Sequence, residues 1–236
     1  MSAATALRQW VKARRHPVAD LAYRLAVAAR CVAMPVVPGV HATLYHLHVV
    51  ARDLLANAMR VLWWTPLFQS RLERPAHGLY LYGGMPLVIG PVELTFGAQC
   101  RVSGQTTISG RSAGRETPRL EVGNNCDIGW QTTIAVGRRV ALGNNVRIAG
   151  RAFLAGYPGH PLNAAARAQG LPDNDDQVGD IVLEDDVWLA TGVTVSAGVR
   201  IGRGTVVAAG SVVTRDLPPG VLAAGAPARV VRAIAE

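Results

Sequence analysis

The most regular part of the chain, residues 183–214, repeats its hydrophobic positions every six residues. Aliphatic side chains recur at that spacing, at Leu183, Leu189, Val195, Ile201, Val207 and Val213. Smaller inward-sized residues follow four places after each of the first five, at Val187, Val193, Val199, Thr205 and Ser211. Neither a helix nor an alternating strand has a period of six, whereas a coil of short parallel strands joined by tight turns does. The pattern therefore predicts a parallel β-helix.

The same spacing extends toward the N-terminus with interruptions. The segment 110–119 is polar and rich in Gly, which predicts a loop that leaves the coil. The block EVGNNCDIG at 121–129 is echoed by ALGNNVRIA at 141–149, an offset of twenty residues, so we expect two extra residues near 136–140. From 156 to 180 the repeat is absent and the sequence is polar. A long irregular excursion from a compact solenoid is usually functional.

Residues 1–75 have a different character, with many Ala, Leu, Arg and Val and few Gly. Apolar residues at three- and four-residue steps predict an amphipathic helix between residues 41 and 64. The segment 66–75 is expected to be a linker. We therefore expect an α-helical N-terminal region (1–75), then a β-helix domain (76–236) with an excursion at 156–180 and a C-terminal cap.

Two alternatives exist for the apolar stripe of the N-terminal region. Charged residues and Pro interrupt its longest apolar runs, so a membrane-spanning helix is not expected. The helix could lie in the plane of a membrane surface, with Trp63, Trp64 and Phe68 as interfacial anchors. It could instead pack against the β-helix or another subunit, and we favour that contact with protein. The N-terminal region is then membrane-peripheral or part of the assembly.

The net charge and the cysteines indicate which cellular location and which binding partners to expect. The net charge is +8, which is compatible with an anionic membrane surface, a phosphorylated ligand, nucleic acid or a generally basic proteome. Cys100 and Cys126 fall at inward positions of the repeat, as expected for reduced thiols in the cytoplasm. The first fifteen residues are unlike a secretory signal peptide. We expect a cytoplasmic protein, or one peripheral to the inner face of the cytoplasmic membrane.

His160 lies on the 156–180 excursion, next to Pro161. An imidazole titrates near neutral pH and can accept a proton from a hydroxyl group. His160, Pro161, Arg167, the Val187–Trp188 pair, the hexapeptide run, GSVVTRD followed by PP, and GAPAR occur in this order. This combination resembles the left-handed β-helix (hexapeptide-repeat) acyltransferases, and among them the galactoside, maltose and polysaccharide O-acetyltransferases. The resemblance covers about residues 90–234.

The resemblance implies an acetyl-CoA-dependent enzyme and a homotrimer with active sites in the grooves between subunits. His160 would be the general base that activates an acceptor hydroxyl for direct attack on the thioester, without an acyl-enzyme. Acetyl-CoA is then a co-substrate, and neither a permanently bound cofactor nor a metal is expected. The acceptor would be a sugar hydroxyl of a surface polysaccharide or lipid-linked glycan. Nucleic acid is not an expected partner.

Other residues match the family's binding positions. Trp188 matches a Trp near the acceptor and the pantetheine arm of the donor. The remaining donor-binding matches are Thr191, Ala209, Thr214, Arg215 and Arg229. The family often has an Asn one coil before the histidine, where this chain has Gly129 followed by Trp130 and Gln131, so Gln131 is the acceptor-binding candidate. The excursion also carries Asp173, Asp175 and Asp176, which could contact an acceptor, although a solvated loop is favoured.

Other functions on a β-helix remain as alternatives. A small-molecule O-acetyltransferase of the serine or antibiotic type would share the donor site but bind another acceptor. A non-catalytic scaffold would need neither a loop histidine nor a basic coenzyme pocket. A carbonic anhydrase on this fold would need three metal-binding histidines, whereas only His77 and His160 lie outside the helical region. A sugar nucleotidyltransferase would need a Gly-rich phosphate-binding domain, which residues 1–75 do not supply.

Overall fold

The computed structural model describes residues 2–234 and divides the chain into two compact units, Met1–Ala51 and Arg52–Glu236. The division falls within a helix, whereas the change from helices to strands falls between residues 69 and 80. The helical elements are α1 (Ala3–Ala13), α2 (Pro17–Cys31), α3 (Pro38–Met59), a π-helical turn (Arg60–Trp64) and α4 (Thr65–Gln69). Among the described residues, no helix is both long and apolar enough to cross a bilayer.

Helix α4 occupies part of the segment that was expected to be a linker, and its residue Phe68 belongs to the hydrophobic core. The linker prediction is wrong for residues 66–69, because Pro66 is tolerated in the first turn of α4. Phe68 is fully buried and meets Phe96 edge to face, with 5.8 Å between the ring centroids. Trp64 packs against the same core. Phe68 therefore belongs to the protein interior, and its assignment as an interfacial anchor is wrong. Trp64 is partly buried and Trp63 is exposed.

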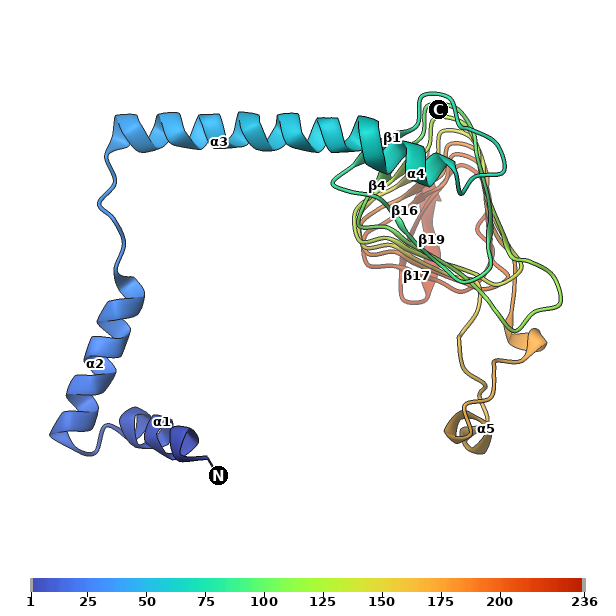
Figure 1. The fold of residues 1–236 in the computed structure, drawn as a ribbon. Coiled ribbons are helices and arrows are strands. Elements are labelled where there is room, and N and C mark those ends of the chain that lie inside the picture. The colour runs from blue at the N-terminus through green and yellow to red at the C-terminus, as the bar shows by residue number, and fades with distance from the viewer. Residues whose placement is uncertain (1, 235–236) are drawn as a thin grey trace. The chain divides into compact units, whose positions relative to one another are not determined.

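Three parallel sheets form the walls of a triangular coil, seen end-on in Figure 1. The eight-stranded sheet contains β1 (Tyr80–Tyr82), β4 (Arg101–Ser103), β7 (Asp127–Ile128), β10 (Arg147–Ile148), β13 (Trp188–Leu189), β16 (Val206–Val207), β18 (Val221–Gly225) and the antiparallel β19 (Ala228–Ala233). The six-stranded sheet contains β2 (Leu87–Ile89), β5 (Thr107–Gly110), β8 (Thr133–Val136), β11 (Phe153–Ala155), β14 (Thr194–Ser196) and β17 (Val212–Val213).

The five-stranded sheet contains β3 (Glu93–Phe96), β6 (Arg119–Val122), β9 (Arg139–Leu142), β12 (Ile181–Leu183) and β15 (Arg200–Ile201). The chain visits the eight-, six- and five-stranded sheets in turn, and Leu183 pairs with Ile201, which lies one three-strand coil later. The predicted left-handed β-helix is therefore confirmed, with helices before it.

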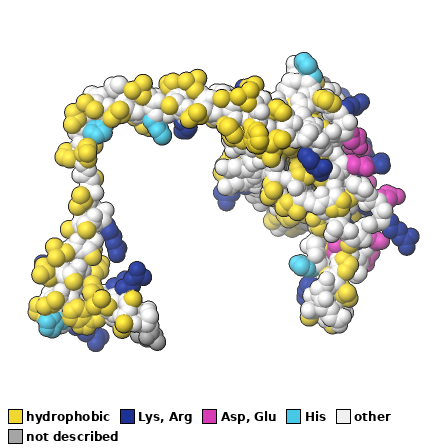
Figure 2. Space-filling model, viewed as in Figure 1, with side chains coloured by type: hydrophobic (Ala, Val, Ile, Leu, Met, Phe, Trp, Pro, Cys, Tyr) yellow, Lys and Arg dark blue, Asp and Glu magenta, His cyan; other side chains and the backbone are white. Residues whose placement is uncertain are grey.

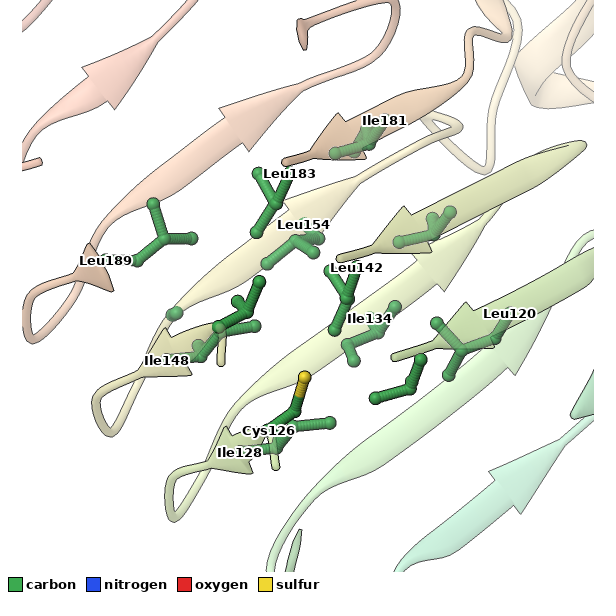
Figure 3. Packing of buried hydrophobic residues seen from close by; sticks show 14 of the residues in the cluster. Leu120, Cys126, Ile128, Ile134, Leu142, Ile148, Leu154, Ile181, Leu183 and Leu189 are labelled. Carbon is green, nitrogen blue, oxygen red and sulfur yellow. The ribbon is translucent and has the colours of Figure 1, made fainter. Parts of the chain in front are cut away.

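The six-residue pattern places its aliphatic side chains in the centre of the coil. All six aliphatic positions of 183–214 and all five smaller positions are buried. Side chains from successive coils stack in columns, as Figure 3 shows for Ile128, Ile148 and Leu189. Cys100 and Cys126 are buried within this core as predicted, and Cys31 is exposed on α2.

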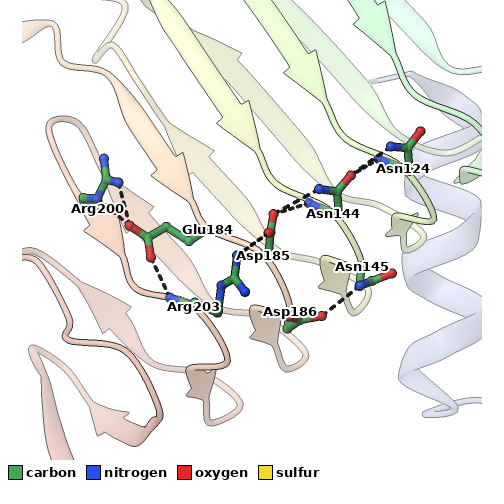
Figure 4. A network of polar contacts seen from close by, with 8 residues as sticks. All are labelled: Asn124, Asn144, Asn145, Glu184, Asp185, Asp186, Arg200 and Arg203. Carbon is green, nitrogen blue, oxygen red and sulfur yellow. Dashed lines mark hydrogen bonds and ion pairs between the residues drawn. The ribbon is translucent and has the colours of Figure 1, made fainter.

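Two polar ladders fasten one edge of the coil, between the five- and eight-stranded sheets (Figure 4). Asn124 donates to Asn144 Oδ1 at 3.0 Å, and Asn144 donates through its backbone N–H to Asp185 Oδ1 at 2.7 Å. The adjacent ladder joins Asn125, Asn145 and Asp186 at 2.9 Å per step. Residues of this second ladder have positive φ, which Asn and Asp tolerate better than other side chains.

The three interruptions of the repeat all occur at another edge, between the six- and five-stranded sheets. The loop 111–118 joins β5 to β6, residues 137–138 join β8 to β9, and residues 156–180 join β11 to β12. The offset of twenty is confirmed by the pairing of Ile134 with Leu154, and the two extra residues follow Val136. Stacking these insertions on one edge leaves the other two edges regular.

A buried ion pair fastens the excursion to the first loop. Arg111 and Asp173 have side chains only 4% exposed, with Nε and Oδ2 3.0 Å apart, and Arg111 Nη2 also donates to the Asp173 carbonyl at 2.8 Å. Asp175, at the surface, accepts from Nη1 at 2.7 Å. Burial alone would lower the pKa of Arg111, but the hydrogen bonds that it donates to Asp175 and Asp173 outweigh burial and raise the pKa. The favoured expectation of a solvated loop is therefore wrong for Asp173.

Replacing a buried Thr by Val should change the free energy of unfolding in opposite directions at Thr132 and Thr205. Thr132 is fully buried and its hydroxyl has no partner among the described residues, so Thr132→Val should raise the free energy of unfolding by about 1 kcal/mol. Thr205 is equally buried but donates to the Pro218 carbonyl at 2.6 Å and accepts from Val221 N–H. Thr205→Val should lower that free energy by about 1–3 kcal/mol. Denaturant unfolding of both variants measures this difference.

Removing Arg111 should release the excursion. Arg111→Met would leave the Asp173 carboxylate buried without its partner, at a cost of about 3–5 kcal/mol. We expect faster proteolysis and hydrogen exchange within residues 156–180, and Asp173→Leu added to Arg111→Met should restore most of the protection. The matched control is Arg119→Met, which breaks an exposed pair with Glu93 worth about 0–1 kcal/mol. Equal protection in Arg111→Met and the control would contradict this role.

Candidate functional site

His160 is an exposed residue of the excursion, between β11 and the short helix α5 (Ala164–Ala168). Its neighbour Pro161 is buried, which fixes the backbone on one side of it. Arg167 donates to the carbonyl oxygens of Pro161 at 3.0 Å and Leu162 at 2.6 Å. Arg167 therefore holds the turn that follows His160. No carboxylate of residues 2–234 hydrogen-bonds to the His160 ring.

The base of the excursion has further anchors. Tyr157 Oη and Ser109 Oγ lie 3.2 Å apart, and Arg138 donates to the Val178 carbonyl at 3.2 Å. Together with Arg111 and Asp173, these contacts tie the excursion to both neighbouring insertions on its edge. The histidine is thus exposed to solvent on a segment that is attached at several points.

A hollow of about 490 Å³ lies on the outer face of the eight-stranded sheet. Trp188 and Thr191 line it, so the structure brings together two residues that the sequence singled out. The other lining residues are Tyr82, Asp127, Gly129, Trp130, Arg147, Ile148, Ala149 and Gly150. Trp130 and Trp188 are about half exposed, at 46% and 50%, so their rings are available to a ligand.

Two glycines shape the floor of this hollow. A Cβ on Gly150 would lie 2.5 Å from Nε1 of Trp130, so the indole lies directly over that glycine. A Cβ on Gly129 would lie 2.7 Å from backbone atoms of residues 148 and 150. An Asn at position 129 would therefore require the backbone to shift. The hollow has an indole surface where the resembling family often has an amide.

Charged groups border the same hollow. Arg147 follows Asp127 and precedes Trp188 in the stacked register of the sheet, and it donates to the Asn125 carbonyl. Asp127 Oδ2 lies 3.4 Å from Nη1 of Arg101. Burial raises the pKa of Tyr82, and the negative charge of Asp127 raises it further, so this phenol remains protonated near neutral pH. The hollow thus offers aromatic surfaces beside one carboxylate and one guanidinium group.

The remaining predicted residues divide between two edges of the coil. Thr191 and Ala209 occupy the turns between the eight- and six-stranded sheets, where Gly210 N–H donates to the Thr191 carbonyl at 2.9 Å. Gln131 lies in an earlier turn of this edge with φ of 56°, exposed and outside the set that lines the hollow. Thr214 and Arg215 follow β17, on the edge that carries the excursion.

Arg229 lies in β19, opposite Ala224 of β18, with its side chain exposed. One chain therefore presents Trp188, Thr191 and Ala209 along one edge and His160 from another. His160 does not line the hollow beside Trp188. The predicted residues form two separate groups within the described part of a single chain.

Sequence reasoning missed Tyr82, Asp127 and Arg147 as lining residues, and treated Trp130 only as a neighbour of Gln131. The stacked register could have identified Asp127 and Arg147, because these two residues are separated by the same twenty residues as the repeated NN blocks. Tyr82 could not be found this way, because the first coil lacks a clear six-residue repeat.

A larger hollow, of about 600 Å³, lies on the five-stranded sheet. Its charged side chains pair with one another, with Arg139 2.6 Å from Glu121 and Arg203 2.7 Å from Asp185. The hydrogen bond from Arg139 lowers the pKa of Glu121 and keeps it ionised. This charged surface therefore has its own partners, and the hollow beside Trp188 is the better candidate for binding. Residues 2–234 contain no group of three His, Cys, Asp or Glu placed to hold a metal ion.

Comparisons with known proteins agree with this architecture. Residues 180–215 match the family described as bacterial transferase hexapeptide (six repeats). The chain is 36% identical over 119 residues to galactoside O-acetyltransferase of Escherichia coli (strain K12), a match that covers 49% of this chain and 54% of that protein. The chain spans about half the length of the curated relatives it matches.

A solved structure also shares the fold. AntD, an N-acyltransferase from Bacillus cereus in complex with dTDP and 3-hydroxybutyryl-CoA, superposes with a TM-score of 0.56 at 14% sequence identity. The superposition covers 72% of this chain and 87% of AntD. At that identity the likeness concerns the fold alone, and the repeat match and the coil geometry carry the assignment. The β-helix of this chain thus carries the hexapeptide repeat of bacterial transferases and is similar in sequence to a galactoside O-acetyltransferase.

Proposed function

We propose that the protein is an acyltransferase that moves an acetyl group from acetyl-CoA to a hydroxyl group of a sugar. The acceptor would be part of a surface polysaccharide or a lipid-linked glycan. The sequence similarity to galactoside O-acetyltransferase supports a sugar acceptor. The hollow supports it too, because the indole surfaces of Trp130 and Trp188 suit the apolar faces of a sugar ring while Asp127 and Arg147 suit its hydroxyl groups.

The observation that carries this proposal is the exposed His160 on an anchored excursion. An alcohol is a weak nucleophile until its proton is removed, and a positioned imidazole contributes about 10²–10⁴-fold by removing it in the transition state. The buried Arg111–Asp173 pair and the Arg167 contacts restrict the backbone that carries this group. Such restriction supports catalysis, because it reduces the entropy lost when the reacting groups are brought together.

The reaction follows from these parts. His160 accepts the proton of the acceptor hydroxyl as the hydroxyl oxygen attacks the thioester carbonyl carbon. The tetrahedral intermediate then collapses, the C–S bond breaks, and the imidazolium returns its proton to the departing sulfur of coenzyme A. Both substrates must be present together, and no acyl group is attached to the enzyme.

The donor-binding residues are proposed on the same basis. Thr191 and Ala209 occupy adjacent coils of one edge and could bind the pantetheine arm through their backbone groups. Trp188 lies beside Thr191 in the hollow and would contact the same arm and the acceptor. Thr214, Arg215 and Arg229 are exposed and would contact the nucleotide end, where guanidinium groups pair well with phosphate. Gln131, exposed in an earlier turn of the same edge as Thr191, remains an acceptor-binding candidate.

We propose that the working unit is a homotrimer. His160 and the Trp188 hollow belong to different regions of one chain, so each site needs a histidine from one copy and a hollow from the next. A head-to-tail contact repeated around a threefold axis closes after three copies and makes three equivalent sites. The proposed location is the cytoplasm, where acetyl-CoA is produced, or the inner face of the cytoplasmic membrane.

Replacing His160 should remove most of the activity. With a responsive acceptor, His160→Ala should release free thiol from acetyl-CoA at least about 100-fold more slowly, because the general base is lost. The matched control is His77→Ala, an exposed histidine outside the excursion, which should keep the original rate. The measurement is the rate of thiol release from acetyl-CoA with each member of a panel of acceptors, which contains galactosides, oligosaccharides, serine and aminoglycosides.

The panel separates the candidate functions. Turnover with sugars supports the proposal, and turnover with serine or an aminoglycoside alone replaces it with a small-molecule acetyltransferase. An unchanged rate in His160→Ala would remove His160 from the mechanism. Failure to bind coenzyme A at all would favour a non-catalytic β-helix scaffold.

A further inference from the structure

Much of the chain's excess charge lies at its N-terminus. Residues 1–32 contain six basic side chains, Arg8, Lys12, Arg14, Arg15, Arg24 and Arg30, and one acidic side chain, Asp20. The difference is +5 of the chain's +8, although the segment is only a small part of the 236 residues. A positive field of this kind attracts anionic surfaces.

The single acidic group in this segment is already paired. Asp20 Oδ1 lies 2.6 Å from Nε of Arg14, and Oδ2 lies 2.7 Å from Nη2 of Arg24. The hydrogen bond from Arg14 holds the pKa of Asp20 below its usual value. Arg14 also stacks over the Tyr23 ring at 4.9 Å, so these contacts fasten the turn between α1 and α2. The remaining basic groups, Arg8, Lys12, Arg15 and Arg30, have no acidic partner among the described residues.

Both helices expose apolar faces despite their contact with each other. In α1, Leu7 and Trp10 recur at helical spacing, with Arg8 and Lys12 on the other side. In α2, Val18, Leu21 and Leu25 recur in the same way, and all three are more than half exposed. Ala19 is the only buried residue of the two helices within the described range. Figure 2 shows hydrophobic and basic side chains side by side over this segment.

The combination suits a lipid surface better than another protein. A helix that covers a protein core usually needs no concentrated single-sign charge, whereas an in-plane membrane helix combines an apolar face, an aromatic anchor such as Trp10 and basic residues. Two copies of this segment would also bring together two surfaces of charge +5. For α1 and α2, the charge distribution favours a lipid surface over a protein partner.

We infer that the α1–α2 hairpin, residues 2–32, binds the surface of an anionic lipid bilayer, with Leu7, Trp10, Val18, Leu21 and Leu25 facing the acyl chains. The basic side chains would then contact the lipid phosphates. This inference is independent of the proposed acetyl transfer, since lipid binding requires neither His160 nor a donor.

Cys31 provides a direct probe, because it is exposed at the end of α2 while Cys100 and Cys126 are buried. The full chain, labelled at Cys31 with an environment-sensitive fluorophore, is mixed with vesicles of phosphatidylglycerol and phosphatidylcholine or of phosphatidylcholine alone. We expect co-sedimentation and a blue-shifted emission with the anionic vesicles only, and weaker binding as salt is raised.

Matched variants test the charge and the apolar faces separately. Arg8→Glu with Lys12→Glu should weaken binding at least about 10-fold, whereas Arg71→Glu with Arg74→Glu makes the same charge change elsewhere and should have a smaller effect. Leu21→Gln with Leu25→Gln should also weaken binding at least about 10-fold, with the exposed pair Leu87→Gln and Ile89→Gln as control.

Two results would overturn the inference. The first is equal binding to both kinds of vesicle, or to neither. The second is a blue shift that grows with protein concentration without lipid and is unchanged by vesicles, because a second copy of the hairpin would then cover the apolar faces. Thiol release measured on the same variants without vesicles separates a failure of membrane binding from a failure of the proposed activity.

Discussion

The stacking of one aliphatic side chain from every six residues determines the rest of this structure. Leu183, Leu189 and Val195 occupy the three walls of one coil, and Ile201, Val207 and Val213 lie directly beyond them in the next. Burying such side chains contributes about 1.5–3 kcal/mol each before the entropy of ordering the chain is counted. Because every column must continue from coil to coil, additional residues can leave the coil only at its edges.

That constraint explains why the candidate site residues lie at the edges and on the outer face of the coil. The three insertions leave the coil at the same edge, where Arg111 of the first reaches Asp173 of the third. The regular edge between the eight- and six-stranded sheets presents repeated turns such as those at Thr191 and Ala209. A rigid coil thus separates a projecting histidine from an aromatic hollow, and this separation is the physical basis for proposing a site shared between copies.

The repeat allowed the core to be predicted residue by residue, because a six-residue period has few structural solutions. All the inward positions of 183–214 are buried, and the two-residue insertion after Val136 was also expected. Long-range polar pairing was not predictable. Nothing in the sequence links Arg111 to Asp173, 62 residues away, and the composition of the excursion favoured a solvated loop.

The N-terminal boundary illustrates a similar limit. In the sequence, Phe68 follows Trp63 and Trp64 closely and resembles an aromatic residue at a membrane interface. In the structure, it contacts Phe96 and lies in the core. For the candidate site, Trp188 and Thr191 were found through the family resemblance and lie together. Asp127 and Arg147 follow from the stacked register, whereas Tyr82 is found only in the folded structure. The family resemblance implied active sites between subunits, and the structure adds the edge of the coil on which each predicted residue lies.

The central claim is that each active site combines His160 of one chain with the hollow of its neighbour. Subunit complementation tests it most directly: two differently tagged chains, His160→Ala and Thr191→Trp, are co-expressed and the mixed assemblies are purified. Thr191 is an exposed turn residue that lines the hollow, so the Trp should block binding without disturbing the coil. The account predicts that each parent is inactive and that the purified mixed trimers regain about a third of the original activity, because one of the three interfaces in each mixed trimer has both halves intact. Mixed assemblies as inactive as either parent would contradict it.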